Sequence, residues 1–84
     1  MKVTIDPKAA AIYVKMRDGK VARTKEFAPE IFADIDSAGH LLGVEMLHPG
    51  TLGIKQVARK FHRPLLAKLA PDLDRIYTKL ASAH

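Results

Sequence analysis

The sequence predicts an α+β fold, with an antiparallel meander of four to five strands in residues 1–47 and two to three amphipathic α-helices in residues 51–83. In the first part, apolar and polar residues alternate with a period of two, and short turn sequences separate the runs. In the second part, apolar residues recur every three to four positions, as on one face of a helix. We therefore expect a single domain of 84 residues, in which the helices pack on the sheet or on a partner.

The first strands are expected to follow one another along the meander. Residues 3–5 alternate in polarity and end at Asp6-Pro7, a typical turn. Residues 12–16 alternate again and lead to Asp18-Gly19. This dipeptide favours a tight hairpin, because glycine tolerates the positive φ that such a turn requires. We therefore expect residues 20–27 to return as the partner of residues 12–16.

The last two strands are expected to form a hairpin. A type I turn over Asp36–Gly39, with Gly39 in the left-handed region, pairs Asp36 with His40 and Asp34 with Leu42. Both faces of the hairpin are then largely apolar, which is unusual for a sheet with one side in water. We therefore expect the helices to cover one face and a second copy of the chain to cover the other. The expected partner surface consists of Phe32, Leu42, Val44, Met46, Leu73, Ile76, Tyr77 and Leu80.

The helical part contains two prolines that mark boundaries. Residues 54–61 carry the first apolar stripe, and Arg63-Pro64 ends it. A further helix begins at Leu65. Pro71 fits the first turn of another helix, followed by the apolar stripe of residues 73–80.

Composition excludes several classes of protein. The chain has no cysteine, so it has neither a disulfide framework nor thiolate chemistry. A hydrophobic content of 48% is too high for a disordered tail. Its longest apolar run, residues 9–14, is far too short to span a membrane. We expect a soluble cytoplasmic domain that binds no membrane.

The excess positive charge is confined to the second part of the chain. Residues 1–47 hold seven basic and seven acidic residues, whereas residues 48–84 hold seven basic and two acidic ones, which gives the whole net charge of +5. Such asymmetry indicates an acidic partner, either nucleic acid or a protein, although a solvated helix face has the same pattern. The candidate contact residues are Lys55, Arg59, Lys60, Arg63 and Lys68. The turn lacks the glycine of a helix-turn-helix motif.

Asp34, Asp36 and His40 are the candidate ligands for a divalent metal ion. The two aspartates lie two apart on a strand and share a face, and the expected register places His40 opposite Asp36. The alternative is a solvated hairpin end. Residues 34–45 also match part of an EF-hand calcium loop, but Ala38 offers no ligand there. No nucleophile or phosphate loop accompanies these residues, so we expect neither catalysis nor a cofactor.

Three segments resemble the YuzE-like small bacterial proteins, a family of unknown function. They are residues 6–16 (DPKAAAIYVKM), 21–27 (VARTKEF) and 33–47 (ADIDSAGHLLGVEML). The chain departs from the family in having Lys8 and Ala10 after the Asp-Pro turn, and in its helical extension. The resemblance implies a small dimeric sheet protein without an established activity, and some members resemble the antitoxins of toxin–antitoxin pairs.

These observations lead to three hypotheses for function. The first is a non-enzymatic homodimeric protein-interaction module, antitoxin-like, with a toxin-like partner. The second is a nucleic-acid-binding protein that uses the basic helical segment 51–68. The third is a metal site at Asp34 and Asp36.

Overall fold

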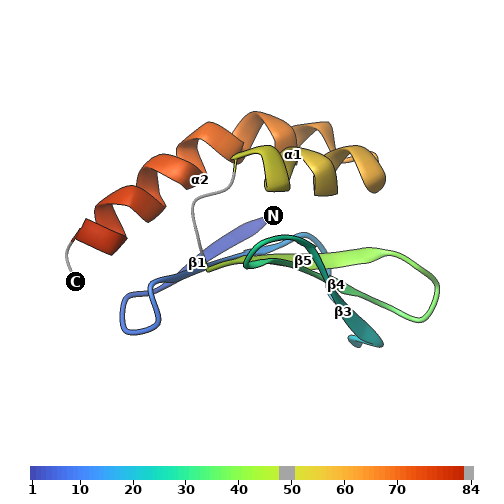
Figure 1. Ribbon diagram of the computed structural model, residues 1–84. Coiled ribbons are helices and arrows are strands. Elements are labelled where there is room, and N and C mark those ends of the chain that lie inside the picture. The colour runs from blue at the N-terminus through green and yellow to red at the C-terminus, as the bar shows by residue number, and fades with distance from the viewer. Residues whose placement is uncertain (48–50, 83–84) are drawn as a thin grey trace.

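The computed structural model describes residues 1–47 and 51–82, which form two layers (Figure 1). Both helices lie over the same face of the sheet, and among the described residues no layer covers the other face. The predicted α+β class is confirmed. The elements are β1 (Lys2–Asp6), β2 (Ala11–Lys15), β3 (Arg23–Ala28), β4 (Ile31–Ile35), β5 (Leu41–Met46), α1 (Thr51–Lys60) and α2 (Pro64–Ser82). Residue 83 of the predicted extension lies outside the described residues.

The sheet is antiparallel with the strand order β1-β2-β5-β4-β3, so the predicted simple meander is wrong. β5 pairs with β2 in the place where β3 was expected. The backbone N–H groups of Met16 and Arg17 donate to Leu42 O, which ties the end of β2 to β5. Gly19 has no positive φ. Its role is close approach, because a Cβ there would stand 2.8 Å from the Leu42 side chain.

The β4–β5 turn forms as predicted, but the register beyond it does not. Gly39 has a φ of 89° and donates to Asp36 O at 3.1 Å, and Asp36 N–H donates to His40 O at 3.0 Å. Asp34, however, pairs with Gly43 and not with Leu42. Leu42 is the extra residue of a β-bulge, and one extra residue turns every following side chain to the opposite face.

This shift overturns the prediction of two apolar faces. Val44 and Met46 point toward the helices and pair with Ala33 and Ile31, whereas Glu45 turns outward beside Phe32. The helix-covered face and the helices together form the core, which consists of Ile12, Val14, Ile31, Ala33, Ile35, Leu41, Val44, Met46, Ile54, Val57, Ala58, Leu66, Ala70, Leu73 and Tyr77. The open face carries Tyr13, Phe32, Asp34, Gly43 and Glu45.

Most of the expected partner surface is therefore used inside the chain. Leu42, Val44, Met46, Leu73 and Tyr77 are buried, so these side chains are not available to a partner. Ile76 and Leu80 pack partly against the core. Of the predicted set, Phe32 remains half-buried on the open face.

A tight turn joins the two helices. His62 takes a left-handed φ of 55°, and Arg63 N–H donates to Ala58 O at 2.8 Å, which is the long hydrogen bond of a Schellman cap. Pro64 then opens α2, where its missing N–H costs nothing. The predicted boundary at Arg63-Pro64 is confirmed, whereas Pro71 lies inside α2 and starts no new helix. Neither described helix combines the length and apolar content that a membrane span requires.

Candidate functional site

The outer surface of the helix layer contains a shallow groove of about 370 Å³ beside the α1–α2 turn. Its floor consists of small side chains from both helices, Ala58, Pro64 and Ala67. Its polar lining is basic and consists of Lys55, Arg59, His62 and Arg63. The groove is therefore lined by basic side chains that can bind an anion, and the small side chains at its base leave space for that anion.

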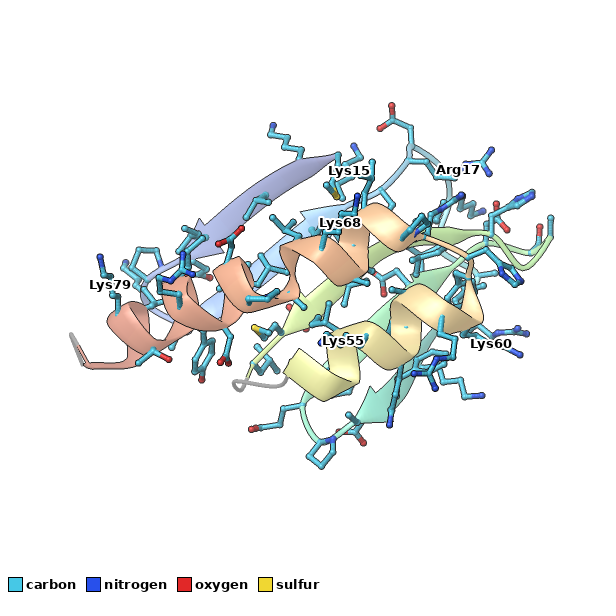
Figure 2. The ribbon with its side chains drawn as sticks, turned by 90° about the horizontal axis from the view of Figure 1, so that it is seen from above. Lys15, Arg17, Lys55, Lys60, Lys68 and Lys79 are labelled. Atoms are coloured by element: carbon cyan, nitrogen blue, oxygen red, sulfur yellow. The ribbon has the colours of Figure 1, made fainter. Side chains whose placement is uncertain are left out.

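The fold of α1 explains why these cations gather there. Ile54, Val57 and Ala58 are buried against the sheet, which turns Lys55 and Arg59 outward, one helical turn apart. The Schellman turn then places His62 and Arg63 at the end of the same groove. Figure 2 views this layer from above, with Lys55 and Lys60 on α1 and Lys68 on α2.

The predicted contact residues carry uncompensated charge. Within residues 1–47 and 51–82, no ion pair engages any of Lys55, Arg59, Lys60, Arg63 and Lys68. An ion pair on α2 joins Arg75 to Asp72 at 2.9 Å, farther along that helix. α1 itself contains no acidic residue that could pair with its cations. The structure brings Lys55, Arg59 and Arg63 together at the groove, whereas Lys60 and Lys68 are exposed outside it.

A second hollow of about 350 Å³ adjoins the groove and has a different chemistry. The two hollows share His62, Arg63 and Pro64, but the second is also lined by Met1, Met16 and Leu65. Leu65 is 64% exposed and Met1 is 60% exposed. An apolar surface therefore lies next to the basic one.

The open sheet face has a polar cluster of its own. Tyr13 Oη donates to Asp34 Oδ2 at 2.8 Å, and Thr24 Oγ1 donates to Asp34 Oδ1 at 2.6 Å. The Tyr13 side chain crosses β5 directly over Gly43, where any Cβ would collide with the phenol ring. Burial, and then the hydrogen bond and negative charge of Asp34, raise the pKa of Tyr13 to about 12. These contacts satisfy the cluster within the chain.

The predicted metal ligands do not converge. Asp34 accepts hydrogen bonds from Tyr13 and Thr24, as described above. Asp36 holds the hairpin turn, where its Oδ1 accepts from the backbone of Ala38 and His40, and His40 Nδ1 lies 3.0 Å from its Oδ2. These hydrogen bonds, led by that of the His40 backbone, lower the pKa of Asp36. No group of three potential metal ligands is found in the described part of the chain.

His62 belongs to the basic stretch of the sequence but was not among the predicted contact residues, and it lines the groove. It carries the left-handed φ of the cap, a position usually taken by glycine or asparagine. The Arg63-Pro64 boundary is the sequence signal for a turn here, but only the fold shows that this turn opens into the basic groove.

Residues 2–48 match the model of a family described as proteins of unknown function, DUF2283. The chain belongs to this family. Neither a curated protein nor a solved structure matches it. The match contains the five strands and the polar cluster of the open face, but neither helix. The basic groove is thus built by the part of the chain outside the family match.

Proposed function

We propose that this protein is a non-enzymatic nucleic-acid-binding module that holds a phosphate backbone along the basic groove between α1 and α2. The observation that carries the proposal is the group of cations at this groove, Lys55, Arg59 and Arg63, none of which has an ion-pair partner in the described residues. Lys60 and Lys68 extend the positive surface along both helices.

Phosphate suits this lining for chemical reasons. A guanidinium group binds two phosphate oxygens at once, and Arg59 and Arg63 both line the groove. Exposed lysines add point charges that displace counterions from the nucleic acid. Binding to the backbone gives little sequence preference, because base edges carry the sequence information.

The surface favours a duplex over a single strand. Single-strand binding uses aromatic side chains on which bases stack. On the helices, Tyr77 is buried and Phe61 packs edge-on against Phe27, with ring centroids 5.8 Å apart. Among the described residues, no phenylalanine or tyrosine side chain lines the groove.

A second candidate function is a protein-interaction module, as in the antitoxin-like hypothesis. The observation that favours it is the apolar hollow lined by Met1, Met16 and Leu65, because exposed apolar side chains anchor protein interfaces. The narrower YuzE-like resemblance and the toxin-like partner remain part of this second proposal.

Fluorescence anisotropy with labelled duplex DNA at several salt concentrations tests the first proposal. The variant Lys55→Ala/Arg59→Ala/Arg63→Ala is compared with Lys8→Ala/Arg17→Ala/Lys20→Ala, which removes the same charge from exposed residues outside the groove. We expect the groove variant to bind the duplex more weakly, with a slope of log K against log salt that is smaller by about 3. We expect the control to retain the native affinity and slope.

Three results would contradict the nucleic-acid proposal. Equal losses in the two variants would indicate non-specific attraction by net charge. Tighter binding of single strands would contradict the duplex preference. Loss of a co-purifying protein on Leu65→Ser, without any DNA binding by the native chain, would replace the first proposal by the second.

A further inference from the structure

The two edges of the sheet differ in how well they are protected from pairing with another strand. β3 has a bulge between Glu26 and Ala28, and Lys25 Nζ lies over the Phe27 ring at 5.2 Å from its centroid. α1 also contacts β3. Bulges, lysines and covering helices all block edge pairing.

β1 has no such bulge, and its lysine, Lys2, stands at the first position of the strand. The strand pairs with β2 without a register shift, and all five of its residues are exposed. Val3 and Ile5 lie on the helix-covered side of the sheet, yet they remain 39% and 44% exposed. Its outer backbone edge has no partner in the described residues, since β1 ends the strand order. An exposed edge strand of this kind is a template for another strand.

The sequence of β1, KVTID, is complementary to itself when read antiparallel. Pairing centred on Thr4 sets Lys2 against the partner's Asp6 and Val3 against the partner's Ile5. Opposite charges then meet on one face, and β-branched apolar side chains meet on the other. Asp6 Oδ1 holds the following turn by accepting from the backbone of Lys8 and Ala9, whereas Oδ2 accepts no hydrogen bond within the described residues.

We propose that two copies of the chain associate through β1, antiparallel and centred on Thr4, to form one continuous ten-stranded sheet. The register is compatible with the backbone. Along a strand, the backbone N–H and C=O groups of successive residues point to alternate edges. In this register each residue of β1 pairs with a residue of the other copy whose number differs from its own by zero, two or four. The groups that do not bond to β2 therefore face the equivalent free groups of the other copy. The contact is isologous and closes as a two-fold dimer.

This arrangement places both helix layers on the same side. Directly paired residues of an antiparallel ladder point to the same face, so the two basic grooves lie on one side of the joined sheet. A dimer then presents two grooves to one duplex and binds it with avidity. The pairing itself does not rest on the proposed nucleic-acid function, and its test uses no nucleic acid.

Charge exchange tests the pairing and its register, with the mass in solution measured by sedimentation equilibrium at micromolar concentration. Lys2→Glu sets like charges together in both halves of the contact, and so does Asp6→Lys. Each variant alone is expected to dimerise at least about tenfold more weakly than the native chain. An equimolar mixture of the two restores opposite charges at both ends, so we expect dimers containing one copy of each variant.

A second variant keeps the test decisive if Asp6→Lys fails to fold. Ile5→Lys places a charge at the seam and is expected to give single chains. Val21→Lys, at a 47% exposed position in the loop between β2 and β3, is expected to remain dimeric. The proposal is overturned if the native protein is a single chain at micromolar concentration, or if Ile5→Lys dimerises as the native chain does. A folded mixture of the charge variants that stays monomeric would also overturn it.

Discussion

The two faces of the sheet meet water in different ways. The helix-covered face is apolar, and the helices shield it completely at positions such as Ile31 and Val44, which are 0% exposed. The open face instead carries Asp34, Glu45 and the hydrogen-bonded Tyr13. The difference follows from the bulge at Leu42, which turns the apolar residues of β5 toward the helices and leaves polar side chains on the open face.

The largest expected effect is a difference in stability between alanine variants of two neighbouring residues of β4. Ile31 is buried under the helices, so Ile31→Ala is expected to lower the free energy of unfolding by about 2–4 kcal/mol. Phe32 lies half-buried on the open face, so Phe32→Ala is expected to cost less than half as much. Urea denaturation of both variants measures the difference. Equal losses would mean that another layer covers the open face.

The next effect concerns the crossing of Tyr13 over Gly43. Gly43→Ala introduces a Cβ into the space of the phenol ring and is expected to cost about 2 kcal/mol of stability. In a Tyr13→Ala background the same change is expected to be nearly neutral. The double-mutant cycle reports the coupling between the two positions. Additive losses would contradict the close contact on the open face.

A smaller expected effect is the dependence of stability on pH that follows from the raised pKa of Tyr13. Its raised pKa means that the folded state favours the neutral phenol, so this contribution to stability is complete below pH 10.0 and is lost as pH rises toward about 12. In a Tyr77→Phe background, tyrosinate absorbance is expected to follow the same high midpoint. Asp34→Asn is expected to lower the pKa of Tyr13, since it removes a charge beside the hydroxyl. An unchanged midpoint would contradict the cluster.

The smallest expected effect is a change in stability at the turn between α1 and α2. His62 has a left-handed φ of 55°, which glycine adopts without strain. We therefore expect His62→Gly to raise the free energy of unfolding by about 0.5–1 kcal/mol. Gln56→Gly, at an exposed position inside α1, is expected to lower it by about 1 kcal/mol. Thermal denaturation distinguishes the two, and a loss of stability in His62→Gly would contradict the cap.

Short sequence patterns predicted the strands, helices and turns well, but they did not predict which strands pair across long distances in the sequence. Gly39 and Asp36 define their turn through contacts within four residues, so the sequence was sufficient for it. Asp18-Gly19 has the same local signature, but β5 takes the place beside β2 through contacts far along the chain. The bulge at Leu42 left no local trace, and it decides which face every later residue of β5 occupies.

The candidate site was predicted in part for the same reason. The unbalanced charge of residues 48–84 pointed to Lys55, Arg59 and Arg63, because charge is visible in composition. The groove itself depends on how α1 and α2 pack, which also brings in His62 and leaves Lys60 and Lys68 outside. The predicted meander placed the first strand at an edge of the sheet, as observed for β1, but it placed the last strand at the other edge, where β3 lies.

The most direct test of the account is to map duplex DNA onto the two faces by NMR, following backbone amide shifts of the labelled protein during titration. The account predicts shifts at Lys55, Arg59, His62 and Arg63 around the groove, with Thr24, Asp34 and Glu45 on the open face unchanged. Shifts concentrated on the open face, with the groove unaffected, would contradict it.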